Sequence, residues 1–216
     1  MKARRRRSLE KPASKVGTGV PSGQRAAAKH GRRRKIRAVA LVGFMGAGKS
    51  SVGRALSEQL GWMFEDLDER IERRERRKVA EIFRESGEAG FRKAEHAALK
   101  ELLADVKNGE EKIVALGGGA FAQEKNARVL GATGAVTIFL DAEPDELWKR
   151  CRGQEDVERP LLGSRESFCE LYAARRPHYL KARVRQDTGG KTVAQNAAEL
   201  VKVLGLKRGA GRRGET

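Results

Sequence analysis

The 216-residue chain is long enough to bury a core within one domain, with 35% charged and 39% hydrophobic residues. The ends carry most of its formal net charge of +17, because residues 1–37 hold a net +13 and residues 207–216 a net +3. No apolar run reaches 18 residues, no apolar segment follows the basic N-terminus, and the two cysteines lack metal-ligand spacing. These features argue against a membrane span, a secretory signal, a disulfide framework and a zinc site, and we expect a cytoplasmic protein.

Two basic tails are predicted to flank the folded part of the chain. Residues 1–35 are rich in Arg, Lys, Ala, Gly, Ser and Pro and nearly free of large apolar side chains, which is typical of disorder. Residues 207–216 form a second basic disordered tail. The N-terminal extension has three readings: a solvated tail, a contact for nucleic acid or another polyanion, or an organelle transit peptide. Any nucleic-acid contact would be non-specific, because no aromatic residues are interleaved with the charges.

Between the tails, residues 36–206 alternate strands with helices and are predicted to form one domain. Strands are expected at 36–42, 63–65, 112–116, 136–140 and 182–185. Helices are expected at about 49–61, around Leu147 and over 193–204. Charged helical segments are expected to break near Gly87 and to end near 108. A further helix should begin with an N-cap at Ser164 and bend or end at Pro177.

This alternation predicts an α/β fold with three layers and a doubly wound, five-stranded parallel sheet. In such sheets ligands bind beyond the carboxyl ends of the strands. The loops 43–50, 66–68 and 117–119 each follow a predicted strand. We therefore expect these three loops to share one edge of the sheet.

The first of these loops matches a phosphate-binding pattern. Gly43, Gly48, Lys49 and Ser50 fit G-x-x-x-x-G-K-[ST] between a predicted strand and a predicted helix. Glycines let backbone N–H groups converge on an anion, and the helix N-terminus adds a positive dipole. Lys49 can place its charge at the β- and γ-phosphates, and Ser50 can offer a hydroxyl to Mg²⁺. An ordinary glycine-rich turn is the alternative, but the strand–loop–helix context favours nucleotide binding.

The other two loops carry paired carboxylates and a run of glycines. Asp66 and Asp68 can divide two tasks, one near Mg²⁺ and one accepting a proton from an attacking hydroxyl. Their alternative reading is a pair of strand-end caps or a solvated acidic turn. The triple glycine at 117–119 indicates a second place where backbone approaches a ligand, whereas a plain turn needs only one or two glycines.

Three arginines are candidates for binding anions. Arg175 lies on an otherwise apolar helical stripe, where a guanidinium needs an anionic partner. Arg92 lies one step from an apolar stripe and, taken singly, reads as a surface arginine. Arg159 stands in a polar segment that fits either a mobile lid closing over ATP or a solvated loop.

In combination these residues resemble the shikimate kinase family, with motifs in that family's order over about residues 36–205. The matching segments are Gly43-Phe44-Met45-Gly46-Ala47-Gly48-Lys49-Ser50, Phe64-x-Asp66-x-Asp68-x-x-Ile71-Glu72, Glu81-Ile82-Phe83-x-x-x-Gly87-Glu88-x-x-Phe91-Arg92-x-x-Glu95, Leu116-Gly117-Gly118-Gly119-Ala120, Arg159-Pro160-Leu161-Leu162 and Arg175-x-Pro177-x-Tyr179. Many kinases share the phosphate loop, whereas the Asp-x-Asp, Phe-Arg, triple-glycine and Arg-x-Pro-x-Tyr set is much more specific.

The resemblance implies a P-loop fold like that of nucleoside-monophosphate kinases. It also implies ATP-dependent phosphorylation of the 3-hydroxyl of shikimate to shikimate 3-phosphate, in chorismate and aromatic amino acid biosynthesis. The implied partners are shikimate and ATP with Mg²⁺, and the protein is expected to be a monomer. Residues 66–96 would form the substrate-binding part, and residues 152–164 the lid.

The resemblance also implies roles for single residues. The catalytic residues would be Asp68, Lys49 and Arg159. ATP would be bound by Gly46, Ala47, Gly48, Lys49, Ser50, Ser51 and Arg159, and Mg²⁺ by Ser50 and Asp66. Shikimate would be bound by Asp68, Arg92, Gly117, Gly118, Gly119 and Arg175, with the arginines on its carboxylate.

The sequence departs from the family pattern at two places. After Ile71-Glu72 the family usually has a glycine and then a Ser or Thr helix cap, where this chain has Arg76 and Lys78. We expect the turn, the cap and the mobility of the substrate-binding part to differ. The loop at 187–191 lacks the arginine that some members use near adenine, so no adenine contact is assigned.

Two other functions compete with this interpretation. One is a P-loop kinase for a different polyol or a nucleotide, since a fold does not determine a substrate. The other is a kinase-like sensor whose basic N-terminus binds nucleic acid, although residues 1–35 contain no helix-turn-helix pattern. The presence of Lys49, Asp66, Asp68 and Arg159 together favours catalytic turnover.

Overall fold

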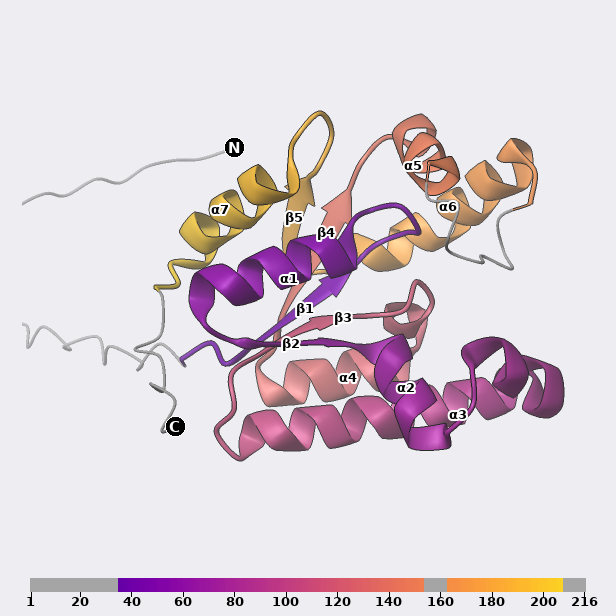
Figure 1. Ribbon diagram of the computed structural model, residues 1–216, viewed down its shortest axis with the longest axis horizontal. Helices are drawn as coiled ribbons and strands as arrows, with labels where there is room; N and C mark the ends of the chain where they lie inside the picture. Colours follow the sequence, from indigo (N-terminus) through magenta and orange to yellow (C-terminus); the bar gives the residue numbers. More distant parts are fainter. Residues whose placement is uncertain (1–34, 154–162, 208–216) are drawn as a thin grey trace, which may run out of the picture. The chain divides into compact units, whose positions relative to one another are not determined.

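The computed structural model describes residues 35–153 and 163–207 and contains one parallel sheet (Figure 1). Its strands are β1 (Ala38–Val42), β2 (Met63–Asp66), β3 (Lys112–Ala115), β4 (Val136–Asp141) and β5 (Val184–Asp187), in the order β2-β3-β1-β4-β5. Every neighbouring pair of these strands runs parallel. The predicted five-stranded parallel sheet is therefore confirmed, with β5 two residues further along the chain than expected.

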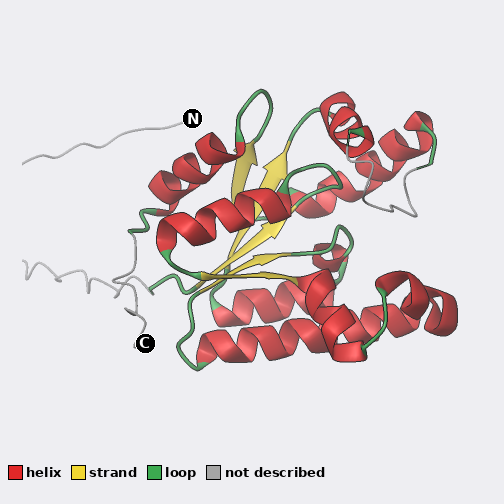
Figure 2. Ribbon diagram, in the orientation of Figure 1, coloured by secondary structure: helices red, strands yellow, loops and turns green. Residues whose placement is uncertain are grey.

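Helices cover both faces of this sheet, as Figure 2 shows by colour. They are α1 (Lys49–Leu60), α2 (Leu67–Glu75), α3 (Val79–Lys107), α4 (Glu124–Thr133), α5 (Pro144–Arg152), α6 (Arg165–Tyr179) and α7 (Val193–Leu204), with a 3-10 turn η1 at Ala120–Ala122. Helices α1 and α7 pack together on one face, and α3 and α4 pack together on the other. Within the described residues, no helix is both long and apolar enough to cross a membrane.

The central strands form the core of the sheet because most of their residues are apolar. All five residues of β1 are buried, as are all four of β3. The edge strands differ: β2 is only partly buried, and Met63 is 56% exposed. Continuous apolar runs are typical of parallel strands that are covered on both sides, and for this reason the central strands could be predicted from the sequence.

The connections after β1 and β3 leave the sheet toward opposite faces. Helix α1 follows β1 on the α7 side, whereas η1 and α4 follow β3 on the α3 side (Figure 1). Neighbouring strands whose connections diverge leave a crevice at their carboxyl ends, where ligands bind in sheets of this type. The loop 43–48 follows β1 and the glycines 117–119 follow β3, so both lie at this end of the sheet, which we call the crevice.

Two helices test what the sequence predicts about helix breaks. The predicted break at Gly87 is present, because Gly87 has φ 65° and ψ −177° inside α3. For α6 the sequence predicts a bend or an end at Pro177; the helix does not end there but continues to Tyr179. A proline removes only one backbone donor near a helix end, and the hydroxyl of buried Tyr179 donates to the carbonyl of Gly118, which anchors this last turn.

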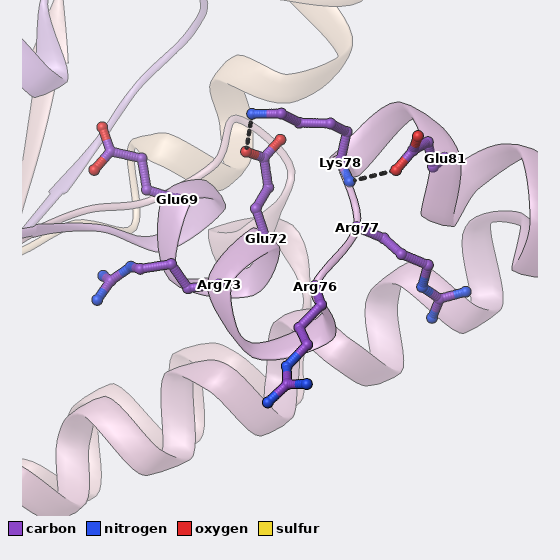
Figure 3. A pocket seen from close by; sticks show the side chains of 7 residues that line it. All are labelled: Glu69, Glu72, Arg73, Arg76, Arg77, Lys78 and Glu81. Carbon is purple, nitrogen blue, oxygen red and sulfur yellow. Dashed lines mark hydrogen bonds and ion pairs between the residues drawn. The ribbon is translucent and has the colours of Figure 1, made fainter.

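The connection between α2 and α3 keeps its turn despite Arg76 and Lys78. Arg76 ends α2 with φ 54°, the left-handed conformation that usually calls for glycine. Carboxylates replace the missing cap of α3: Glu81 accepts from Lys78 N–H (2.8 Å), and Glu72 accepts from Val79 N–H (3.1 Å). The Lys78 ammonium pairs with Glu72 at 2.9 Å, whereas Arg76 points away from this pair (Figure 3).

We expect Arg76→Gly to stabilise the protein. A residue with a Cβ in the left-handed region is strained, so glycine should raise the free energy of unfolding by about 0.5–1 kcal/mol, despite the entropy it adds to the unfolded chain. Urea denaturation followed by circular dichroism measures the change. Arg73→Gly is the matched control, because Arg73 lies inside α2, and there glycine should destabilise by a similar amount. Equal effects of the two substitutions would contradict the strain at Arg76.

Candidate active site

The loop between β1 and α1 has the backbone geometry of an anion cradle. Gly46 and Gly48 have φ of 79° and 82°, and Gly48 is the N-cap of α1. A Cβ on Gly46 would lie 2.6 Å from the carbonyl oxygen of Leu147 in α5, so no side chain fits there. Lys49 folds back over the loop and donates to the carbonyls of Gly43 and Phe44, each at 3.0 Å. Backbone donors, a helix N-terminus and an ammonium group therefore meet at one place.

Asp66 connects this loop to the neighbouring strand end. Its Oδ2 accepts from the Ser50 hydroxyl at 2.7 Å, and its Oδ1 accepts from the backbone N–H of Asp68 at 3.0 Å. Asp66 thus caps α2, as one alternative had it, and also faces the phosphate loop. A hydroxyl and a carboxylate are oxygen ligands of the kind that Mg²⁺ prefers, so this pair fits that ion.

Ser50 and Asp66 supply only two ligands. This number suffices in phosphoryl-transfer sites, where Mg²⁺ is held by one or two protein groups together with phosphates and water. In the described ranges 35–153 and 163–207, no group of three or more His, Cys, Asp or Glu side chains could hold a metal ion by itself. A metal at this site would therefore depend on the nucleotide for further ligands.

Asp68 lies in the first turn of α2 with a carboxylate oxygen that lacks a partner. Its Oδ1 is buried and makes no hydrogen bond within the described part of the chain. Burial raises the pKa of the Asp68 carboxyl to about 6, the negative charge of Asp66 adds to the rise, and Lys49 opposes it. A buried acceptor without a donor, with a raised pKa, is suited to take a hydrogen bond or a proton from a bound hydroxyl.

The three consecutive glycines each face a different charged side chain. A Cβ on Gly117 would lie 2.7 Å from Oδ1 of Asp68, and one on Gly119 would lie 2.6 Å from Nη2 of Arg92. A Cβ on Gly118 would lie 3.2 Å from Nη1 of Arg175. The structure thus brings together one carboxylate from α2, one guanidinium from α3 and one from α6, around backbone that carries no side chains.

Arg92 is held by acids on its own helix. Its Nη1 donates to Oε1 of the fully buried Glu95 at 2.9 Å, and its Nη2 donates to Glu88 at 3.2 Å. Burial raises the pKa of Glu95, while the Arg92 guanidinium opposes that shift. The side chain of Arg92 is only 16% exposed, so the reading of Arg92 as a plain surface arginine is wrong.

Arg175 lies between an aromatic ring and a phenol. Its guanidinium carbon is 6.0 Å from the centre of the Phe44 ring, which belongs to the phosphate loop. Burial raises the pKa of Tyr179 to about 12, and the positive charge of Arg175 opposes this rise. Because Tyr179 also donates to the Gly118 carbonyl, the end of α6 is joined to the glycine turn.

Most of the predicted site residues therefore surround the crevice, with exceptions. Arg159 and most of the predicted lid lie outside the described residues, as do nearly all of the two predicted tails. Glu95 and Tyr179 carry no predicted role, although both belong to the motifs shared with the family. Asn126, which contacts Glu95, had no sequence signal at all. A hollow of about 470 Å³ beside the α2–α3 connection contains none of the predicted site residues. It is lined by Glu69, Glu72, Arg73, Arg76, Arg77, Lys78 and Glu81 (Figure 3).

Comparison with known proteins points to one family. The family model described as shikimate kinase matches residues 45–205. A shikimate kinase of Persephonella marina is 40% identical over 167 residues, which cover 77% of this chain and 98% of the relative. A shikimate kinase of Symbiobacterium thermophilum is 42% identical over 170 residues, which cover 77% of this chain and 95% of the relative.

Solved structures give the same answer. The structure described as shikimate kinase from Acinetobacter baumannii in complex with shikimate matches with a TM-score of 0.70 and 31% identity, covering 78% of this chain and 93% of that one. A sugar kinase from Janibacter sp. HTCC2649 matches with a TM-score of 0.56 at 14% identity, which shows a shared fold and no more.

Proposed function

Because the chain belongs to the shikimate kinase family, and thus phosphorylates shikimate at the expense of ATP, we propose that its active site is the crevice at the carboxyl ends of β1, β2 and β3. ATP binds on the side of the phosphate loop, and shikimate binds on the side of the triple glycine. One observation carries this assignment: three adjacent glycines pack against Asp68, Arg175 and Arg92, which come from three different helices.

On the ATP side, backbone N–H groups of Gly46, Ala47 and Gly48 surround the phosphates, and Ser51 completes the first turn of α1. Lys49 leaves its two carbonyl acceptors and pairs with the β- and γ-phosphates. Ser50 and Asp66 would hold Mg²⁺, which would neutralise charge on the phosphate oxygens. Arg159 remains a predicted second cation for these phosphates.

On the shikimate side, charge complementarity determines the orientation. The guanidinium groups of Arg92 and Arg175 pair with the carboxylate of the substrate, since arginine binds carboxylates through parallel N–H donors. The glycine backbone allows the ring to approach closely, and Asp68 accepts a hydrogen bond from the hydroxyl that is to be phosphorylated. The ring is thus held by its acidic end and by its reacting end.

Phosphoryl transfer then depends mainly on positioning. The transition state is loose and metaphosphate-like, so alignment of the hydroxyl oxygen with the γ-phosphorus matters more than early proton removal. Asp68 orients that hydroxyl through its Oδ1 and takes the proton as the new P–O bond forms. The bond between the γ-phosphorus and the bridging oxygen breaks at the same time, and ADP leaves. Its raised pKa makes it a better proton acceptor than an ordinary aspartate, while it remains ionised at pH 7 to 8.

The test is ADP release in the presence of ATP and Mg²⁺, measured on the parent protein and on alanine variants of the glycine turn. With shikimate we expect turnover, and with gluconate or a nucleoside monophosphate we expect none. Gly119→Ala should raise the KM for shikimate about 5- to 20-fold, since the new methyl group displaces the guanidinium of Arg92. Gly117→Ala should lower kcat instead, because its methyl group presses on Asp68.

The matched control is Gly131→Ala in α4, where an added Cβ meets nothing within 4 Å. Its kinetic constants should equal those of the parent, and its stability should rise by about 0.5–1 kcal/mol. Turnover with gluconate but not with shikimate would contradict the substrate assignment. Parent-like kinetics of both Gly117→Ala and Gly119→Ala would contradict the location of the site.

A further inference from the structure

Asn126, in the first turn of α4, is a polar side chain with no exposed surface. Its amide nitrogen donates to the carbonyl of Ala120 at 3.0 Å and to Oε2 of Glu95 at 3.4 Å. Its amide oxygen lies 2.7 Å from Nδ1 of His96. Both amide hydrogens and the amide oxygen are therefore engaged, and they fix the side chain in one orientation.

Two of the three partners of Asn126 connect it to parts of the proposed shikimate site: Ala120 to the glycine turn, and Glu95 to Arg92. Ala120 follows the triple glycine directly and begins the turn η1. Glu95 is the buried acceptor of Arg92, with Nη1 and Oε1 2.9 Å apart. The asparagine thus bridges the glycine turn and the carboxylate that holds the arginine, although Asn126 itself contacts neither Arg92 nor the glycines through any of these bonds.

We propose that Asn126 is a positioning residue for substrate binding: by fixing the Glu95 carboxylate against the glycine turn, it holds the guanidinium of Arg92 beside Gly119. This inference rests on the role proposed above for Arg92. When the amide is lost, Oε2 of Glu95 is left without that donor in a buried site. The carboxylate then turns both oxygens toward the guanidinium and draws Arg92 away from the glycine turn.

The experiment compares steady-state kinetics of Asn126→Leu with those of the parent enzyme. The KM for shikimate should rise about 5- to 30-fold, while kcat and the KM for ATP change less than twofold, because the lost donor acts through Arg92 alone. Asn196→Leu is the matched control. Asn196 is another buried asparagine, on α7, and its partners are Gln186 and the carbonyl of Thr192. That variant should lose stability without any change in the KM for shikimate.

A double-mutant cycle with Arg92→Met shows whether the effect passes through the arginine. In the Arg92→Met background, Asn126→Leu should produce no further rise in the KM for shikimate, whereas an independent effect on folding would add to it. An additive cycle, or an unchanged KM in Asn126→Leu alone, would overturn the inference. An unchanged KM in Arg92→Met alone would instead overturn the proposed role of Arg92.

An isosteric variant serves where Asn126→Leu does not yield folded protein. Asn126→Asp places a carboxylate against Glu95 and the Ala120 carbonyl, and it should raise the KM for shikimate at least as much. Adding Glu95→Gln restores a donor between positions 95 and 126 and leaves an amide oxygen for Arg92. The double variant should therefore recover most of the lost affinity, and failure to recover any of it would count against the bridge.

Discussion

Asp68→Asn is expected to lower kcat about 10²- to 10⁴-fold while leaving the KM for ATP nearly unchanged. The amide keeps the size of the carboxylate and can still contact the substrate hydroxyl, but it cannot accept the proton. ADP release with saturating ATP, Mg²⁺ and shikimate measures the loss. Glu69→Gln, the next residue of α2 and exposed, is the control and should keep parent activity. An Asp68→Asn variant as active as the parent would remove Asp68 from the mechanism.

The pH dependence of the parent enzyme should report the same carboxylate. The pKa of Asp68 is raised to about 6, chiefly by burial. Only the ionised form accepts the proton, so kcat/KM for shikimate should fall as the pH drops through about 6. In Asp68→Asn this acidic limb should disappear from the residual activity. A limb that persists at the same pH would assign it to a different group.

The same substitution should make the protein more stable at neutral pH. The pKa of Asp68 in the folded protein lies above the ordinary aspartate value of 3.8, so ionised Asp68 destabilises the folded state above about pH 6, and this penalty vanishes below about pH 4. Asp68→Asn should therefore raise the free energy of unfolding by about 1–3 kcal/mol at pH 7, with the gain shrinking as the pH falls from 6 to 4. Urea denaturation of both proteins at pH 7 and at pH 4 measures the difference in the free energy of unfolding.

Arg175→Met is expected to raise the KM for shikimate about 10- to 100-fold. The substitution removes a charge-assisted hydrogen-bond donor set beside Gly118 but keeps a long apolar side chain against Phe44. The KM for ATP should stay within about threefold of the parent value, since the lost contact involves only the acceptor substrate.

The neighbouring arginine provides the matched control. Arg176 faces away from the crevice: it donates to the Tyr172 hydroxyl at 3.1 Å and to the buried Asp141 at 3.2 Å. Arg176→Met should therefore lower stability and leave the KM for shikimate unchanged. If the two variants have equal kinetic effects, the difference assigned to these adjacent arginines is wrong.

The sheet could be predicted from the sequence because its central strands are continuous apolar runs. At the edge this signal weakens. β5 has a mixed burial pattern, and Gln186 is its one buried residue, so the polar residues of Val184–Asp187 gave no clear period. The sequence predicts a bend or an end at Pro177, and the helix does not end there. Local propensity cannot register that Tyr179 donates to Gly118, which is 61 positions away in the sequence.

The candidate site was predictable in its parts but not in its pairings. Lys49, Ser50 and Asp66 follow from the phosphate-loop pattern and from the order of strands. That Gly117 faces Asp68 while Gly119 faces Arg92 depends on how α2 and α3 pack, which no spacing encodes. Asn126 was missed because a single buried asparagine has no periodicity, and its role depends entirely on its three partners.

The side-chain-free turn at 117–119 also limits how inhibitor resistance could arise. A competitive inhibitor that copies the acid and the ring of shikimate would lie against main-chain atoms, which mutation cannot alter. Any larger residue at 117 or 119 would strike Asp68 or Arg92 and impair the enzyme itself. Resistance to such a compound would have to come from substitutions in the surrounding helices, and each of these would also weaken the binding of shikimate.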